Sequence, residues 1–153
     1  MHRDPLALDP SPPALQLDNQ VCFALYSASL AMTKLYKPLL EQIGLTYPQY
    51  LVMLALWEQD GTTVSALGER LFLDSGTLTP LLKRLQAAQL LERTRDAQDE
   101  RRVRITLTPQ GRALRQGAER IPACMRQSTQ CALPELVALT AQLHTLRDRL
   151  SAR

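Results

Sequence analysis

The stretch from Thr62 to Thr108 decides the fold, and it reads TTVSALGERLFLDSGTLTPLLKRLQAAQLLERTRDAQDERRVRITLT. Apolar residues recur at helical spacing in two short runs, 64–71 and 78–85. Between these runs the sequence LDSG breaks the pattern, and Asp74 or Ser75 can accept the free N–H groups at the start of the second helix. The stretch therefore predicts two short helices joined by a turn.

The second part of the stretch changes from helical to strand periodicity. From residue 102 to residue 108, polar side chains alternate with Val103, Ile105 and Leu107, as in a half-buried strand. Residues 90–95 form a weaker strand pattern on the other side of the polar run 96–101. Helix, turn, helix and charged hairpin is the order of a winged helix-turn-helix. We therefore predict a mainly α fold with a small β wing, whose DNA-reading unit covers about 62–108.

The polar face of this unit suits double-stranded DNA. Small residues begin the second helix and allow it to approach a groove closely, and two basic side chains on later turns can reach phosphates. The candidate contacts on this helix are Ser75, Gly76, Thr77, Thr79, Lys83 and Arg84.

The hairpin places five arginines among four acids between residues 92 and 104. An acid near an arginine can hold its guanidinium pointing outwards, and Asp99 and Arg101 are the pair that we expect to do so, with Arg102 beside them. An arginine at a hairpin tip suits the narrow minor groove, where negative potential is concentrated. The alternative is a solvated, salt-bridged hairpin that binds no ligand.

This stretch resembles the MarR family of bacterial regulators. The resemblance is carried by the wing run DAQDERR at 96–102, by the strand at 103–108 and by the following Pro109-Gln110-Gly111. It extends over most of the chain, from about Leu17 to Leu150.

Composition is compatible with a DNA-binding protein but does not require one. The chain has 153 residues, a formal charge of +3 and 45% hydrophobic residues, of which few are aromatic. No apolar run reaches the length of a membrane span, and the first residues, MHRDPLALDPSPP, lack the apolar core of a signal peptide. We expect a cytoplasmic protein that makes no membrane contact, needs no metal or cofactor, and keeps its three cysteines as thiols at first.

The segments on both sides of the wing are expected to build a homodimer. Residues 1–16 hold four of the ten prolines and predict a mobile arm, followed by a single domain over 17–153. A helix starting at Asp18 or Asn19 is apolar on several sides until Pro38 ends or kinks it, and a last helix over 135–150 carries leucines at near-heptad spacing. We therefore assign 17–45 and 109–153 to dimerisation, and a two-fold dimer would read a pseudo-palindromic operator.

Three further patterns predict where other helices begin and end. Gly44 stops the first helix, and Thr46 and Gln49 form a capping box for a core helix over 47–59, with Leu54 and Trp57 on its apolar surface. A helix beginning at 108–109 is expected to run to about residue 121 or beyond, with Pro122 as a possible kink, and the chain breaks again at 131–134.

Cys22 is the residue that could make this protein a sensor. It lies in about the first turn of the first long helix, where free N–H groups and the helix dipole favour a thiolate, the form that attacks a peroxide. Tyr36 and Tyr47 flank the turn at 38–45, so the fold can bring together two phenols that hold a thiolate as neutral donors. The alternatives are a small inert core cysteine and two amphipathic core tyrosines.

A narrower resemblance covers these same residues. Cys22, Tyr36, the run LTYPQY at 45–50 and the run LDSGTLTPLL at 73–82 resemble the organic hydroperoxide resistance regulators, a subgroup of the MarR family. The resemblance implies that Cys22 is the peroxide-sensing thiol and that Tyr36 and Tyr47 hydrogen-bond its sulfur. It also implies repression of a hydroperoxide-reducing enzyme until oxidation releases the DNA.

Two further cysteines make the chain resemble the two-cysteine members of the subgroup, which form a disulfide between subunits. Either Cys124 or Cys131 could meet Cys22 of the other chain, and we prefer Cys124 because Cys131 is expected in the turn ahead of Pro134. A disulfide needs the two Cα atoms within roughly 7 Å, so a longer separation in the reduced form would require the helices to move. The alternative is that both cysteines are idle.

These observations predict a dimeric repressor, not an enzyme, with an organic hydroperoxide as inducer. The residues expected to line the peroxide site are Phe23, Leu25, Tyr26, Met53 and Trp57. Three alternatives remain: a MarR-type repressor released by a small aromatic ligand, a thiol peroxidase with Cys22 as nucleophile, and a winged module that binds protein. The chain has no C-x-x-C motif, which argues against the peroxidase.

Overall fold

The structure is a computed structural model that describes residues 12–152. Most of the expected arm, 1–16, therefore lies outside the described residues. The chain divides into two compact units, up to Leu35 and from Tyr36 onwards, and each is described by itself.

The first unit contains two short 3-10 turns and the first part of a long helix. The turns are η1 (Pro13–Leu15) and η2 (Leu17–Asn19), and the helix is α1 (Val21–Glu41). The expected start at Asp18 or Asn19 is wrong by two to three residues because residues 17–19 form their own turn, and the Asn19 side-chain amide donates to the Pro13 carbonyl at 2.8 Å. Large apolar side chains of α1 in this unit are exposed: Val21, Phe23, Leu25, Tyr26, Leu30, Met32 and Leu35.

Pro38 does not end α1, which continues to Glu41. A proline removes one backbone donor, and the helix persists here for one more turn before the chain turns at Gly44. Gly44 has φ +70°, the left-handed conformation that glycine adopts without steric cost.

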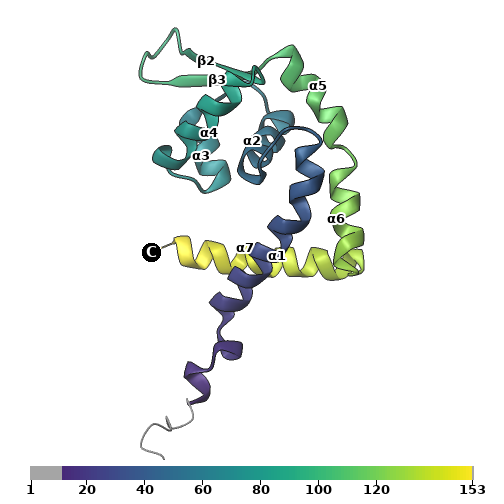
Figure 1. The fold of residues 1–153 in the computed structure, drawn as a ribbon. Coiled ribbons are helices and arrows are strands. Elements are labelled where there is room, and N and C mark those ends of the chain that lie inside the picture. Colours follow the sequence, from purple (N-terminus) through teal and green to yellow (C-terminus); the bar gives the residue numbers. More distant parts are fainter. Residues whose placement is uncertain (1–11, 153) are drawn as a thin grey trace, which may run out of the picture. The chain divides into compact units, whose positions relative to one another are not determined.

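The winged unit follows in the predicted order (Figure 1). Its elements are α2 (Tyr47–Glu58), β1 (Thr62–Thr63), α3 (Val64–Leu71), α4 (Ser75–Ala87), β2 (Leu91–Arg95) and β3 (Val103–Leu107). The antiparallel sheet has the order β1-β3-β2, with Arg93 opposite Ile105 and Thr62 on the other side of Ile105. Strand β1 was not predicted because two residues are too few to show a period of two.

Local capping explains where these helices begin. The Thr46 hydroxyl accepts from the Gln49 N–H and the Gln49 side chain accepts from the Thr46 N–H, which confirms the predicted capping box. Thr63 caps α3 in a similar way, accepting from the Ala66 N–H at 3.2 Å. Helix α3 ends at Leu71, and the next residue, Phe72, has a left-handed φ of 57° that turns the chain towards α4.

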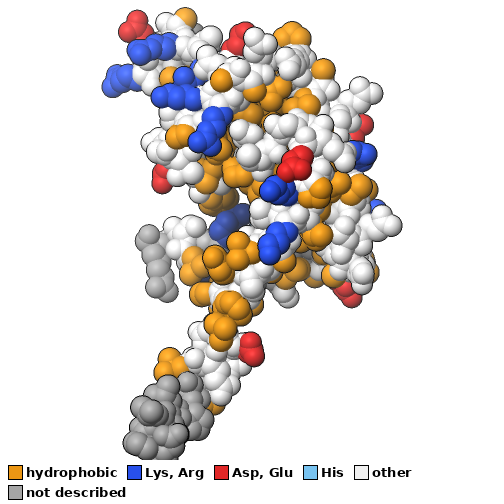
Figure 2. All heavy atoms as spheres, in the orientation of Figure 1, with side chains coloured by type: hydrophobic (Ala, Val, Ile, Leu, Met, Phe, Trp, Pro, Cys, Tyr) orange, Lys and Arg blue, Asp and Glu red, His pale blue; other side chains and the backbone are white. Residues whose placement is uncertain are grey.

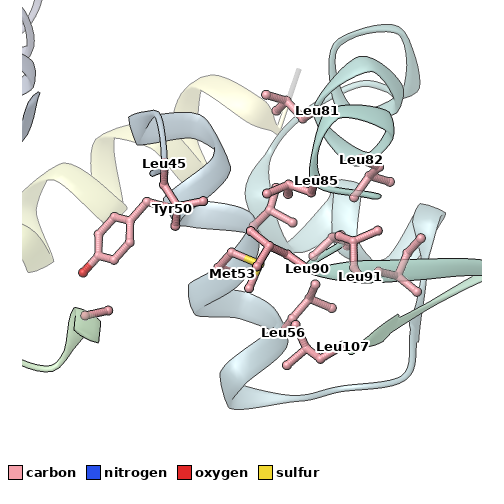
Figure 3. Close-up of a cluster of buried hydrophobic side chains, with 14 of the residues drawn as sticks. Leu45, Tyr50, Met53, Leu56, Leu81, Leu82, Leu85, Leu90, Leu91 and Leu107 are labelled. Atoms are coloured by element: carbon pink, nitrogen blue, oxygen red, sulfur yellow. The ribbon is translucent and has the colours of Figure 1, made fainter. Parts of the chain in front are cut away.

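The core lies between α2, α4 and the sheet (Figure 3). Tyr50, Met53 and Leu56 of α2 pack with leucines from the other elements: Leu78, Leu81, Leu82, Leu85, Leu90, Leu91 and Leu107. Two residues expected on the buried surface of α2 lie differently, because Leu54 is 39% exposed and Trp57 is only half-buried. Helix α2 is apolar on nearly every side, and the winged core covers only part of it.

Three helices complete the chain: α5 (Pro109–Ala118), α6 (Ile121–Thr129) and α7 (Leu133–Ser151). The expected single helix to about residue 121 is wrong, since α5 ends at Ala118 and Pro122 lies in the first turn of α6, where a missing N–H costs nothing. The predicted break between the last two helices is confirmed, but it covers 130–132, and α7 begins at Leu133, two residues before the expected start at 135. None of the residues of α7 up to Ser151 is buried. Among the described helices, none is both long and apolar enough to cross a bilayer.

Candidate functional site

The first turn of α4 presents a polar surface whose shape is set by its cap. The Asp74 carboxylate accepts the Thr77 N–H at 2.7 Å, and this backbone hydrogen bond holds the pKa of Asp74 below its usual value. Ser75, Gly76 and Thr77 are exposed, while the opposite face of the helix is buried in the core. Three of the predicted candidate contacts, Ser75, Gly76 and Thr77, therefore lie at an accessible helix N-terminus.

The tip of the wing has the predicted acid–arginine arrangement. The Arg101 Nε lies 3.6 Å from Asp99 Oδ1, the Arg102 Nε lies 3.8 Å from Asp99 Oδ2, and the Arg101 side chain is 94% exposed. The Asp99 carboxylate also accepts the Arg101 N–H at 3.1 Å. Asp99 thus fixes the turn by accepting a backbone N–H. The guanidinium of Arg101 extends into solvent and stays within ion-pair distance of the Asp99 carboxylate.

The base of the wing is held by Arg104. Its guanidinium donates to the Asp96 carboxylate at 3.2 Å and to the Gly61 carbonyl at 2.5 Å. Asp96 also accepts the Gln98 N–H at 3.0 Å. These bonds join both ends of the hairpin loop to the turn that precedes β1.

An open cleft of about 830 Å³ separates the start of α4 from the wing. It brings together Ser75, Thr79, Arg101 and Arg102 among the predicted residues. Figure 2 shows Lys and Arg side chains gathered over the wing, at the upper left. The predicted Lys83 and Arg84 are exposed on later turns of α4 and do not line the cleft.

Arg93 also lines this cleft, and the sequence did not single it out. Its Nε donates to the Gln86 side chain at 2.7 Å, which ties β2 to the end of α4. The strand pattern at 91–95 could have indicated this position. Leu91 is buried and Arg93 is half-buried, and residues two apart on a strand lie on the same face.

The start of α5 is tied to the winged unit by three contacts. The Trp57 indole N–H donates to the Gly111 carbonyl at 2.9 Å, and the Arg112 guanidinium forms an ion pair with the Asp60 carboxylate at 3.8 Å. A Cβ at Gly111 would lie 2.0 Å from the Leu90 carbonyl oxygen, so only glycine allows this approach. The helix that leads towards Cys124 therefore starts from a rigid support.

Tyr36 and Tyr47 lie together, as predicted, and a third tyrosine joins them. The ring centroids of Tyr36 and Tyr47 are 4.8 Å apart, and Tyr50 lies 5.9 Å from Tyr36 and 6.4 Å from Tyr47. Burial, followed by the proximity of the other two phenols, raises the pKa of Tyr36 to about 12. Burial also raises the pKa values of Tyr47 and Tyr50, so all three phenols are neutral donors at neutral pH.

The three cysteines are free and lie in three different settings. Cys22 is the second residue of α1 and exposed, in the unit that ends at Leu35. Cys124 is half-buried within α6. Cys131 is exposed in the turn between α6 and α7, as predicted, with its sulfur 3.4 Å from the Thr129 carbonyl.

The expected apolar lining of a peroxide site needs one correction. Met53 is fully buried in the winged core and packs among leucines, so it is not available to line an open site. Phe23, Leu25 and Tyr26 are exposed on α1, and Trp57 is occupied by its bond to Gly111. Within residues 12–152, no group of three acidic, histidine or cysteine side chains could hold a metal ion.

Comparison with known proteins agrees with this geometry. The family model described as "Transcriptional regulator SarA/Rot" matches residues 34–117, more than half of the chain. The regulator TtmR of Methylorubrum extorquens is 50% identical over 90% of this chain and 70% of its own. The organic hydroperoxide resistance transcriptional regulator of Bacillus subtilis is 46% identical over 89% of this chain and 92% of its own.

Solved structures of AbfR share the fold. AbfR of Staphylococcus epidermidis is 37% identical, with a TM-score of 0.74 over 90% of this chain and 95% of its own. Reduced AbfR bound to DNA is 35% identical, with a TM-score of 0.74 over 88% and 93% of the two chains. A disulfide-formed AbfR matches with a lower TM-score of 0.59 at 37% identity, over 85% and 91%.

These relatives are transcriptional regulators and not enzymes, and they have the winged architecture described above. The chain is thus a DNA-binding transcriptional regulator, and it belongs to the MarR family of winged-helix proteins, with the organic hydroperoxide resistance regulators among its relatives.

Proposed function

We propose that this regulator is a dimeric repressor that releases a pseudo-palindromic operator when an organic hydroperoxide oxidises Cys22. The observation that carries the proposal is the pair of neutral phenols at Tyr36 and Tyr47, with ring centroids 4.8 Å apart. A neutral O–H donor stabilises a thiolate by hydrogen bonding without bringing a second charge that must itself be desolvated. A relative named as an organic hydroperoxide resistance transcriptional regulator and a structure of disulfide-formed AbfR support the same proposal.

The chemistry has two steps. The Cys22 thiolate attacks the distal oxygen of the hydroperoxide, forming an S–O bond as the O–O bond breaks, and the departing alkoxide takes a proton and leaves as an alcohol. The sulfur is then a sulfenic acid. The thiolate of Cys124 in the partner subunit attacks that sulfur, an S–S bond forms, and the hydroxide leaves as water. Two thiols are oxidised and one peroxide is reduced.

Cys124 is the preferred second cysteine, with Cys131 as the alternative. Cys124 lies within a helix, whose movement would change the position of α5 and of the winged unit tied to it through Gly111. Cys131 lies in an exposed turn, where a new bond would move the winged unit less directly. Formation of the disulfide would shift the two reading units so that they no longer match both half-sites.

DNA contact is assigned to both sides of the cleft. Ser75, Gly76, Thr77 and Thr79 would enter the major groove at the start of α4, with Lys83 and Arg84 on flanking phosphates. Arg101, oriented by Asp99, would enter the minor groove, with Arg102 beside it. The apolar surface of α1 and α7 would be covered by the second subunit.

The test compares the wild type with Cys22→Ser, Cys124→Ser and Cys131→Ser. Cumene hydroperoxide should release operator DNA from the wild type and leave the Cys22→Ser complex intact, as measured by fluorescence anisotropy. A non-reducing gel should show a crosslinked dimer that is lost in Cys22→Ser and Cys124→Ser and kept in Cys131→Ser. Release from Cys22→Ser would reject the cysteine mechanism and favour a repressor that responds to a small aromatic ligand.

A further inference from the structure

Tyr36, Tyr47 and Tyr50 form a cluster of three aromatic rings. We propose that Tyr50 is a positioning residue, which holds the hydroxyls of Tyr36 and Tyr47 where one thiolate can accept hydrogen bonds from both. The inference rests on the proposed function, because Cys22 provides that thiolate. Tyr50 does not need to touch the sulfur for this role.

The geometry makes Tyr50 the third corner of a triangle of rings. Tyr47 and Tyr50 are three residues apart on α2 and share one face of it, while Tyr36 comes from α1. Tyr50 lies 5.9 Å from Tyr36 and 6.4 Å from Tyr47, with interplanar angles of 45° and 46°. Both distances fall within the range in which aromatic rings attract each other.

Burial distinguishes Tyr50 from the other two tyrosines. Tyr50 is 3% exposed and belongs to the leucine core, whereas Tyr36 and Tyr47 are half-buried and pack against that core from outside. Figure 3 shows Tyr50 beside Leu45, with its hydroxyl pointing away from the leucine cluster. A close-packed ring cannot change rotamer without opening the core, so Tyr50 provides the fixed surface for its two neighbours.

Fixed donors bind a developing charge better than mobile ones because they need no reorganisation when the charge forms. Among the described residues, no side-chain oxygen or nitrogen is buried without a hydrogen-bond partner, so the three hydroxyls are not trapped in the core. Without the ring of Tyr50, the side chains of Tyr36 and Tyr47 would gain freedom to rotate. Their hydroxyls would then be less well placed to donate to the same thiolate.

The experiment uses the full-length reduced protein and the variants Tyr50→Phe, which keeps the ring, and Tyr50→Leu, which removes it. The readout is the rate constant for oxidation of Cys22 by cumene hydroperoxide from pH 5 to 9, together with operator affinity before oxidation. We expect Tyr50→Leu to react about tenfold more slowly, as for one weakened hydrogen bond to a charged group. Its pH–rate profile should also move to higher pH, while Tyr50→Phe stays within twofold of the wild type.

Met53→Leu is the matched control, because Met53 is fully buried on the next turn of the same helix and is not part of the ring triangle. It should react like the wild type. Tyr50→Met, which fills the site with a flexible side chain, should repeat the result of Tyr50→Leu and replaces it if that variant does not fold.

Three outcomes would overturn the inference: wild-type kinetics in Tyr50→Leu, equal slowing in Met53→Leu, or equal slowing in Tyr50→Phe. Each of these leaves the proposed function standing as long as Cys22 is oxidised and DNA is released. Peroxide-driven release from Cys22→Ser would instead reject the proposed function itself, so the two failures are distinguishable.

Discussion

At the scale of single residues, the two glycines of α5 differ in what surrounds them. A Cβ at Gly111 would meet the backbone oxygen of Leu90 at 2.0 Å, whereas a Cβ at Gly117 would meet only the side-chain Cγ2 of Ile43, at 3.1 Å. A backbone atom held by neighbouring strands cannot move aside, and a side-chain methyl group can. The junction between the sheet and α5 therefore depends on the absence of one methyl group.

We expect Gly111→Ala to lower the free energy of unfolding by about 2–3 kcal/mol, the usual cost of overpacking. Gly117→Ala should stay within about 1 kcal/mol of the wild type, because alanine favours the helix and offsets the small shift of Ile43. Urea unfolding at one protein concentration measures both. Equal stability of the two variants would show that α5 does not pack tightly against Leu90.

Tyr36 predicts a specific response to alkaline pH. Its pKa is raised to about 12 in the folded protein from an ordinary value of 10.0, so the folded state keeps a proton that the unfolded chain loses. This contribution to stability is fully present below pH 10 and is lost as the pH rises towards 12. Tyr36→Phe should therefore show a shallower fall in melting temperature between pH 10 and 12 than the wild type.

The control for this experiment is Tyr26→Phe, which changes an exposed tyrosine outside the cluster. It should keep the wild-type slope between pH 10 and 12. A slope in Tyr36→Phe as steep as that of the wild type would contradict the environment described for Tyr36.

At the scale of elements, the wing is a short hairpin whose order depends on its base. Arg104 connects Asp96 with the Gly61 carbonyl, and the Asp96 N–H donates to the Arg102 carbonyl at 2.8 Å. Arg101 at the tip has a long ion pair at 3.6 Å and high exposure, which adds little rigidity. The base of the wing, rather than its tip, therefore determines how firmly Arg101 is presented.

Arg104→Gln should speed hydrogen exchange of the Asp96 amide about fivefold, as expected for the loss of roughly 1 kcal/mol of local hydrogen bonding. Operator affinity should fall with it, although Arg104 is not a predicted DNA contact. Arg102→Gln is the control, since it keeps the Arg104 bonds and should leave the exchange rate unchanged. Unchanged exchange in Arg104→Gln would mean that the strands alone hold the wing.

At the scale of the whole molecule, apolar surface remains uncovered on the helices outside the winged core. On α7 these side chains include Val137, Leu139 and Leu143, which are 61%, 51% and 37% exposed. Leu139 and Leu143 lie one helical turn apart, and exposed apolar side chains at this spacing are typical of a helix face that packs against a partner. The proposed dimer would cover it.

Leu139→Glu should raise the dissociation constant of the dimer by about 100-fold or more, because a charge would be placed where the partner helix packs. Operator affinity should fall because one reading unit alone meets one half-site. Analytical ultracentrifugation measures the first effect, with Gln142→Glu as a control that adds the same charge to an exposed polar position. A dimer of wild-type strength in Leu139→Glu would place the interface elsewhere.

The sequence by itself determined the elements whose signals are local. The periods of the apolar residues at 64–85 and 102–108 predicted the two helices and the β3 strand, and side chains within a few residues predicted the caps at Thr46 and Asp74. These features depend on neighbours along the chain, so the sequence contains them. It also predicted the meeting of Tyr36 and Tyr47, because a short turn separates their helices.

Only the tertiary structure decided the contacts between distant segments. Strand β1 exists because Thr62 and Thr63 pair with β3, and α5 starts where it does because Gly111 meets Leu90 and Trp57. Tyr50 becomes part of a cluster, and Met53 a core residue, through packing that no periodicity along α2 distinguishes. The physical reason is that burial depends on which surfaces meet in space, whereas periodicity reports only that some surface must be covered.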